Sequence, residues 1–498
     1  MRAGSQFPAA LAAALVLAIA PVFAGCASYK ENPHLAIVDE TTGYRYSTLS
    51  SDGNTDDLFV ILALSGGGTR AAAFSYGLME GLRAARYVDK DTGAPRTLLE
   101  DVDVISAVSG GSFTAAYYGL FGKRLFNEFK KDFLERDVDG DLIKRALLPT
   151  NWMRLSSSTF DRIDLAAEYY NETIFKEKTY QALLDHRRKP FIILNATDMS
   201  LGRRFEFTQD QFDLLCSDLA KVKVARAVAA SSAFPGLLSP LTLKNHAKKG
   251  CGYKKPKWLE NALNPLNPPW RYFRGVDLWS YQERARDQQY VHLLDGGLSD
   301  NIGLRGPLVA LISETDSAWS VLQLINDDKV KRVVVITANA KTKAHKDWDQ
   351  KQAAPGLFDV LGFVATGPMD NYSFETVQRV TDFFEQEKQN ARTFADCQER
   401  FREQCPAAEM PLVLPTVDVH AVEISFDGIA DDRLRLCMEG LPTNFSLPAP
   451  TVDLLRQVAR NLLLTSPKFQ DAMNGLEPRW EPPESAIDPN LIAAVCPR

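Results

Sequence analysis

Short runs of apolar residues alternate along this chain with longer segments whose apolar residues recur every three or four positions. The first run is Leu58–Leu64, and the segment after it places Phe74, Leu78 and Leu82 at helical spacing. A second run, Val102–Ile105, is followed by a helix-like stretch in the same way. Further strand-like runs are Phe191–Leu194, Val291–Leu294 and Val333–Thr337. This alternation predicts an α/β fold of three layers, a mainly parallel sheet with helices on both faces.

The pattern also divides the chain into segments. We expect a core over 58–345, preceded by a polar tether over 26–57 and interrupted by insertions at about 122–180 and 244–290. A C-terminal α+β extension covers 346–498, with a long helix at Ser373–Phe394, a strand at Val417–Ile424 and a helix at Leu454–Leu464. The extension shows no chemical motif of its own.

A glycine-rich segment, Ser65-Gly66-Gly67-Gly68-Thr69-Arg70, joins the first strand to the first helix-like stretch. Glycine lets a backbone approach a bound group closely, and a helix that starts there adds free N–H groups and the positive end of its dipole. Such N–H groups stabilise the oxyanion of ester hydrolysis. We therefore predict an oxyanion hole at Gly66, Gly67 and Gly68, with Arg70 adding charge or steadying the loop.

A serine follows the second strand in the segment Ala107-Val108-Ser109-Gly110-Gly111. A serine on a sharp turn between a strand and a helix is held as an exposed nucleophile. Ala107 departs from the common G-x-S-x-G pattern, which has glycine at this position. We predict that Ser109 is the nucleophile and that Gly110 and Gly111 leave room for the turn.

The segment Asp295-Gly296-Gly297 places a carboxylate between a strand and a flexible turn. A nucleophilic serine needs a general base within hydrogen-bond reach, and Asp295 is predicted to be that base without an intervening histidine. The six histidines lie in no motif-like setting. A triad in the order Ser…Asp…His, with His345 or His420, is the alternative.

Taken in order, these motifs resemble the patatin-like phospholipase family, which is related to the cytosolic phospholipase A group. The resemblance covers roughly 58–310 and includes two further segments, Asn195–Asp198 and Ala229–Gly236. It implies a Ser109–Asp295 dyad, an oxyanion loop at Gly66–Gly68 with Arg70, and a phospholipid or lysophospholipid substrate. Ser65 stands where patatins often carry Asp-Gly, and resembles the cytosolic phospholipases instead.

The N-terminal segment has a different character. Arg2 precedes an alanine-rich apolar stretch that ends in small residues, which is typical of a secretory signal over 1–25. The ending Ala24-Gly25-Cys26 resembles the lipobox of bacterial lipoproteins, although Phe23 replaces the usual leucine. We expect Cys26 to be lipidated and, because Ala27 follows, the protein to be sorted to the outer membrane, facing the periplasm. The alternative is cleavage near Ala24, which would leave a soluble periplasmic protein.

Cysteines and charge add three expectations. Six cysteines remain beyond Cys26, consistent with disulfides in an exported chain, and the Cys397–Cys405 pair is the first that we expect. No Cys/His spacing is typical of a metal site, so we expect no metal and no organic cofactor. The net charge of −6 gives no reason to expect a nucleic acid partner. Six lysines between Lys244 and Lys257, followed by aromatic residues, favour either a membrane-facing surface or a solvated loop.

The sequence therefore predicts a lipid-anchored serine acyl hydrolase that acts on phospholipid or lysophospholipid. Two alternatives remain. An acyltransferase would use another alcohol in place of water, and a catalytically inactive envelope protein would keep only the scaffold.

Overall fold

The computed structural model describes residues 28–497 except 51–52, 56, 91, 187, 314, 316, 328, 343–349, 351 and 405–416. The predicted signal segment, Cys26 and His345 therefore lie outside the described residues. The strands are β1 (Leu58–Leu64), β2 (Arg86–Val88), β3 (Pro95–Thr97), β4 (Val102–Val108), β5 (Phe191–Asp198), β6 (Arg203–Glu206), β7 (Leu241–Lys244), β8 (Tyr290–Asp295), β9 (Arg332–Asn339) and β10 (Asp418–Ser425).

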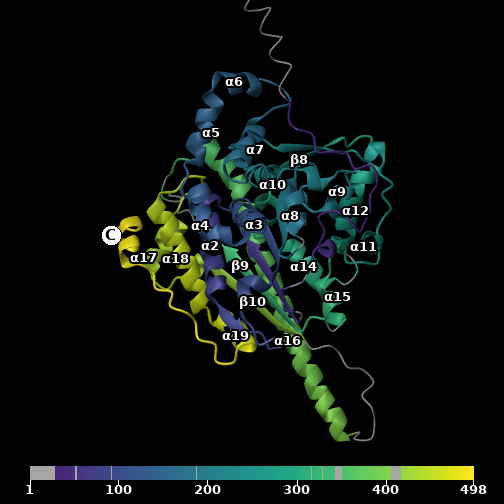
Figure 1. Ribbon diagram of the computed structural model, residues 1–498, viewed down its shortest axis with the longest axis vertical. Helices are drawn as coiled ribbons and strands as arrows, with labels where there is room; N and C mark the ends of the chain where they lie inside the picture. The colour runs from purple at the N-terminus through teal and green to yellow at the C-terminus, as the bar shows by residue number, and fades with distance from the viewer. Residues whose placement is uncertain are drawn as a thin grey trace, which may run out of the picture.

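Helices fill most of the segments between the strands (Figure 1). Those of the first half are α2 (Gly68–Ala84), α3 (Gly110–Phe121), α4 (Leu125–Phe129), α5 (Val138–Leu147), α6 (Pro149–Leu155), α7 (Arg162–Thr173), α8 (Tyr180–His186), α9 (Gln209–Asp213) and α10 (Val224–Ser231). Those of the second half are α11 (Lys257–Ala262), α12 (Pro269–Glu283), α13 (Gly297–Asp300), α14 (Arg305–Ile312), α15 (Val321–Asn326), α16 (Leu357–Gln404), α17 (Asp432–Glu439), α18 (Ala449–Thr465), α19 (Pro467–Leu476) and α20 (Pro489–Val495).

The central sheet has eight strands in the order β10-β9-β1-β4-β5-β8-β7, with β6 paired to β5. The pairs from β10 to β5 are parallel, whereas β8 is antiparallel to both β5 and β7. The parallel strands end at one edge of the sheet, where ligand sites of open α/β folds lie. The mainly parallel sheet confirms the predicted fold class.

Helices cover both faces of the sheet. On one face, α2 packs against α3 and α18, and α3 packs against β4 and β5. Connections between parallel strands are right-handed, so the chain that passes from β9 through α16 to β10, in the direction opposite to β1-β4-β5, runs over the other face. There α13 contacts β5, and α16 contacts both α13 and β10. The lower end of α16 projects from the body of the molecule (Figure 1).

The first strand is apolar throughout because both of its faces are covered. All seven residues of β1 are buried, and β4 is buried over its whole length. Strands covered on both faces read as continuous apolar runs rather than as alternating ones. β10 lies in the segment expected as a C-terminal extension, yet it pairs in register with β9, Val422 lying opposite Ile336. The C-terminal segment thus supplies one edge of the central sheet.

Two disulfides form within the described residues, Cys216–Cys251 and Cys437–Cys496. Cys397, which was expected to pair with Cys405, is instead a free and exposed thiol on α16, and Cys405 lies outside the described residues. The expected Cys397–Cys405 pair is therefore wrong. It was chosen because the two positions are close in sequence, whereas folding brings together the Cα atoms of cysteines 35 and 59 positions apart, to 5.6 and 5.8 Å.

The described helices include none with the length and apolar character needed to cross a membrane. Over the same residues, no group of three or more His, Cys, Asp or Glu side chains is arranged to hold a metal ion.

Candidate active site

Ser109 lies on a strained turn between β4 and α3. Its φ of 47° and ψ of −117° are unusual for a residue with a side chain, and such strain is common at functional sites. The backbone N–H of Ser109 donates to the Ser231 hydroxyl at 2.9 Å, and that hydroxyl donates to the Asn195 carbonyl at 2.6 Å. These bonds fix the turn from below. The predicted nucleophile therefore lies at the carboxyl end of β4, on a rigid support.

Asp295 ends β8 beside this turn. Its backbone N–H donates to the Ala233 carbonyl, and its carboxylate Oδ1 accepts from the Gly297 N–H at 2.8 Å. The Ser109 hydroxyl lies near enough to the same carboxylate to lower its pKa through hydrogen bonding. Only 3% of Asp295 is exposed, compared with 6% of Ser109. The structure thus brings together the predicted nucleophile and the predicted base.

The electrostatics of Asp295 suit a proton acceptor. Burial raises the pKa of Asp295 to about 6, although hydrogen bonds from the Gly297 N–H and from Ser109 lower it in part. Desolvation disfavours the charged form of a carboxyl group and makes it a stronger base. A base with a pKa near the working pH is both ionised and able to take a proton.

The glycine-rich loop packs directly on the serine turn. A Cβ on Gly110 would lie 2.0 Å from the Gly68 carbonyl oxygen, and a Cβ on Gly66 would lie 3.2 Å from the Ser109 Cβ. Gly67 and Gly68 have φ values of 137° and 61°, which favour glycine. The two turns can approach this closely only because glycine stands at these positions.

Not every N–H of the loop is available to an oxyanion. The Gly66 N–H donates to the Asn301 carbonyl at 3.0 Å, and the Thr69 N–H donates to the Asn444 carbonyl at 2.8 Å. Over the described part of the chain, the N–H groups of Gly67, Gly68 and Gly110 have no such acceptor. These three donors stand at the starts of α2 and α3, where helix dipoles add positive potential.

Arg70 lies at the first turn of α2 and is 3% exposed. Its Nε donates to the Ala340 carbonyl at 3.0 Å, and its Nη1 donates to the Leu441 carbonyl at 2.9 Å. Arg70 therefore ties the glycine-rich loop to the segments that follow β9 and α17. Two roles were considered for Arg70, adding charge and steadying the loop. This geometry matches the second.

Of the two histidines considered for the alternative triad, the structure describes His420, which lies away from Ser109 and Asp295. His420 is on the edge strand β10, where its ring contacts Asp418 and Asp471, and it pairs with Val334 rather than with the carboxyl end of β9. His292 is exposed on β8 and contacts the Thr242 hydroxyl. His345 lies outside the described residues.

The sequence did not identify some of the residues that shape the site. Ser231 holds the turn under Ser109, and Asn301 occupies the Gly66 N–H. Ser231 lies within the Ala229–Gly236 segment, which carried only a resemblance and no role. Gly110 was expected merely to leave room, although the N–H of the residue after a nucleophile is a common oxyanion donor, and that rule could have found it.

Comparisons with known proteins agree with the predicted family. A family model described as patatin-like phospholipase matches residues 62–308, which include the glycine-rich loop, Ser109 and Asp295. A search of curated proteins found no match.

Among solved structures, human GIVD cytosolic phospholipase A2 matches at 13% identity and a TM-score of 0.39, covering 84% of this chain and 63% of that one. The chain thus spans less than two thirds of that protein's length. VipD from Legionella pneumophila matches at 10% identity and a TM-score of 0.30, covering 92% of this chain and 73% of that one. Residues 62–308 thus form a patatin-like phospholipase domain, of the kind found in lipid ester hydrolases.

Proposed function

We propose that the protein hydrolyses fatty acyl esters of membrane phospholipids or lysophospholipids through a Ser109–Asp295 dyad. One observation carries the proposal: a serine on a strained turn lies beside a buried carboxylate whose pKa is raised to about 6 by burial and lowered in part by the serine hydroxyl. Among the described residues, no histidine side chain hydrogen-bonds Ser109 or Asp295. The proposed dyad therefore has a nucleophile beside its base.

The proposed reaction has two steps. The Ser109 Oγ attacks the ester carbonyl carbon while its proton passes to the Asp295 carboxylate. The tetrahedral oxyanion accepts hydrogen bonds from the backbone N–H groups of Gly67, Gly68 and Gly110. When the intermediate collapses, the alcohol leaves with the proton from Asp295. Water, deprotonated by Asp295, then attacks the acyl-serine and releases the fatty acid, and Ser109 regains its proton.

Covalent trapping tests the nucleophile. An alkyl fluorophosphonate should phosphonylate Ser109 with loss of fluoride, and peptide mass spectrometry should locate the adduct. Ser109→Ala should abolish both labelling and release of fatty acid from a mixed panel of phospholipids and lysophospholipids. Labelling of another serine, or fatty acid release by folded Ser109→Ala protein, would refute the assignment. Acyl transfer to an added alcohol in place of free fatty acid would identify an acyltransferase.

The N-terminal segment extends the proposal to membrane anchoring. The Ala24-Gly25-Cys26 sequence supports an acylated Cys26 as the first residue of the mature protein, held at the outer membrane and facing the periplasm. Several acyl chains on one residue give stable anchoring, whereas one gives only marginal binding. Intact-mass measurement of membrane-extracted protein should show the acyl modification, and an unmodified N-terminus at another residue would disprove it.

Such an anchor would lie beside an apolar surface. The Tyr29 N–H donates to the Thr159 carbonyl at 2.6 Å, in the loop between α6 and α7. Three residues of chain span at most about 10 Å, so an anchored Cys26 would bring the bilayer close to α5 and α6. These two helices and the residue between them expose five large apolar side chains: Ile143, Leu147, Leu148, Trp152 and Met153. Exposed aliphatic and aromatic groups of this kind suit the boundary of a membrane.

Two surface variants distinguish this surface from the one expected at 244–290. In the structure Lys244 pairs with Glu31, and Trp270 and Phe273 are exposed on α12. Leu147→Asn combined with Trp152→Ser should lower hydrolysis of anionic vesicles and spare a soluble short-chain ester. The matched pair Trp270→Ser and Phe273→Ser should have little effect. The reverse result would assign docking to the 244–290 insertion.

A further inference from the structure

A cavity of about 640 Å³ lies at the end of α2 that is remote from the glycine-rich loop. Its wall includes Glu80, Arg83 and Arg86 at that end of the helix and Arg456 and Arg460 on α18. Since α2 has 17 residues, a rise of about 1.5 Å per residue places the cavity roughly 25 Å from the start of the helix at Gly68. The cavity is therefore separate from the Ser109 site, and its volume is in the range of small-molecule sites.

The wall of this cavity is strongly basic. Five cationic side chains line it, against two carboxylates, in a chain whose net charge is −6. Glu80 is engaged with Arg456 at 3.4 Å, and Glu100 is engaged with Lys123 at 2.8 Å. Both carboxylates are thus already paired.

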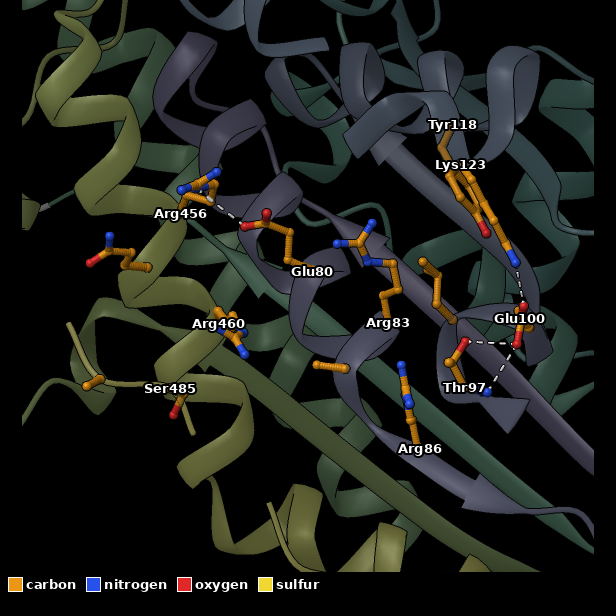
Figure 2. Close-up of a pocket in the computed structure, with 14 residues that line it drawn as sticks. Glu80, Arg83, Arg86, Thr97, Glu100, Tyr118, Lys123, Arg456, Arg460 and Ser485 are labelled. Atoms are coloured by element: carbon orange, nitrogen blue, oxygen red, sulfur yellow. Dashed lines mark hydrogen bonds and ion pairs between the residues drawn. The ribbon is translucent and has the colours of Figure 1, made fainter. Parts of the chain in front are cut away.

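The other three guanidinium groups of the wall, those of Arg83, Arg86 and Arg460, form no ion pair with a carboxylate within the described part of the chain. Arg460 donates to the Glu484 carbonyl, and Arg83 lies over the Phe126 ring at 4.1 Å. Figure 2 shows Arg83 and Arg86 between the α18 side chains on one side and Lys123 on the other. Glu80 attracts Arg83 and Arg460 at longer range as well as Arg456, so one carboxylate is shared among three guanidinium groups, and a bound anion would supply the negative charge that this cluster lacks.

The chemistry of the wall indicates the class of anion. A guanidinium group presents a planar fork of donors that matches phosphate oxygens. Tyr118 and Ser485 add hydroxyl groups, and Leu99, Ala84 and Ala486 add a small apolar area. A lone inorganic ion would leave most of the volume empty, so an organic molecule that carries phosphate fits the cavity better.

The cavity lies between α2 and α18, and both helices begin near the glycine-rich loop. A Cβ on Gly77 would lie 2.1 Å from the Arg456 carbonyl oxygen, and one on Gly81 would lie 2.8 Å from the Leu463 side chain. The α2 and α18 helices therefore run in the same direction, and Figure 1 shows them side by side. Near their other ends, the Thr69 N–H donates to the Asn444 carbonyl. An anion held between Arg83 and Arg460 would bridge the two helices.

We propose that this cavity is a second ligand site, which binds a phosphorylated organic molecule through Arg83, Arg86 and Arg460. The shared chemistry is a phosphate ester, and its source is either a soluble metabolite or the headgroup of a phospholipid. This inference concerns binding and stands apart from the Ser109–Asp295 chemistry.

Calorimetric titration of the full-length protein with glycerol 3-phosphate and with inorganic pyrophosphate tests the soluble source. Co-sedimentation with phosphatidylcholine vesicles, with and without phosphatidic acid, tests the lipid source. The Arg83→Gln, Arg86→Gln double variant should weaken binding at least tenfold and leave hydrolysis of a soluble short-chain ester unchanged. Arg284→Gln combined with Arg286→Gln removes the same charge from two exposed arginines after α12 and should bind like the parent protein.

Saturable binding of either soluble probe that depends on Arg83 and Arg86 assigns a soluble ligand. Arginine-dependent sedimentation that needs phosphatidic acid, without binding of the soluble probes, assigns a lipid headgroup. Absence of binding in every arm would overturn the proposal. Binding that the control pair weakens as much as the Arg83/Arg86 pair would also overturn it, since the effect would then be one of net charge alone.

Discussion

Replacing Asp295 by Asn should abolish activity and at the same time stabilise the protein. In the folded state the pKa of this carboxyl is raised from 3.8 to about 6 by burial. Above pH 6 the native protein therefore holds a buried charge that the unfolded chain hydrates freely. Each pKa unit corresponds to about 1.4 kcal/mol, so ionised Asp295 lowers the free energy of unfolding by about 3 kcal/mol at pH 7.5.

Asparagine keeps the shape of the side chain and its acceptor oxygen for the Gly297 N–H, but it removes the charge. Asp295→Asn should thus raise the free energy of unfolding by up to about 3 kcal/mol at pH 7.5. As the pH falls below the folded pKa, the native carboxyl takes up a proton and its penalty disappears. At pH 5 the advantage of the variant should shrink to about half.

Urea denaturation of the parent, Asp295→Asn and Ser109→Ala at pH 7.5 and pH 5 measures both effects. Ser109→Ala is the matched control, because it should lose activity to the same extent but keeps the buried charge and removes a hydrogen bond to it. It should therefore gain no stability. An Asp295→Asn protein that is less stable than the parent at pH 7.5, or whose advantage does not depend on pH, would refute the raised pKa. Activity in that variant above 1% of the parent would refute the role of base, since general base catalysis contributes about 10²–10⁴-fold.

Four further predictions follow from the same geometry. The kcat/KM for a soluble ester should fall tenfold per pH unit below about pH 6, because the base must be ionised; a profile flat down to pH 4.5 would contradict this. Gly110→Ala should lower kcat by about 10²-fold or more while the protein stays folded, since its Cβ would displace the Gly68 carbonyl, whereas Gly428→Ala, whose Cβ would meet only a side chain at 3.4 Å, should be neutral. Arg70→Lys should lower kcat about tenfold, because one ammonium group does not reproduce two guanidinium bonds to separate carbonyls; an unchanged kcat would remove that role. Reducing the Cys437–Cys496 disulfide should destabilise the protein by up to about 4 kcal/mol in urea denaturation, given the 59-residue separation, and Cys397→Ser should have no effect.

The sequence predicted strands most accurately where both faces of the strand are buried. β1 has the bounds that its apolar run indicated, because both of its faces are covered. β4 was predicted to end at Ile105 but continues to Val108 through Ser106, a polar residue that lies inside the sheet and accepts a hydrogen bond from the Asn195 side chain. A hydrophobic pattern cannot show that a buried hydroxyl group receives a hydrogen bond from an amide that is distant in the sequence.

The hydrophobic pattern predicted neither the direction of β8 nor the two short strands β6 and β7. β8 was predicted as a strand, and the structure adds that it runs antiparallel to β5. β6 and β7 have four residues each and were not predicted. Direction depends on the path of the chain through the 244–290 insertion rather than on the residues of the strand itself. The two ends of that path meet in the β7–β8 strand pair, where Lys244 lies opposite Tyr290.

The sequence predicted the side chains of the candidate site. It did not predict which backbone N–H groups are available there. Ser109 and Asp295 carry chemistry in their side chains, so their motifs identify them. The distribution of N–H donors depends instead on which carbonyl groups approach the loop, and a carbonyl group is present in every residue. Nothing in the sequence indicates that the Asn301 carbonyl occupies the Gly66 N–H and leaves Gly67, Gly68 and Gly110 as donors.

The same reasoning explains why the C-terminal segment showed no chemical motif although it helps to position the glycine-rich loop. Its contribution consists of backbone groups, the Leu441 carbonyl that accepts from Arg70 and the Asn444 carbonyl that accepts from Thr69. A Cβ on Gly68 would lie 2.2 Å from the latter oxygen, so the contact leaves no room for a side chain. The glycine-rich loop is therefore held between β1 on one side and, on the other, a segment that includes Leu441, 371 residues after Arg70. Its geometry depends on the packing of α18 against α2, which no pattern local to either segment could indicate.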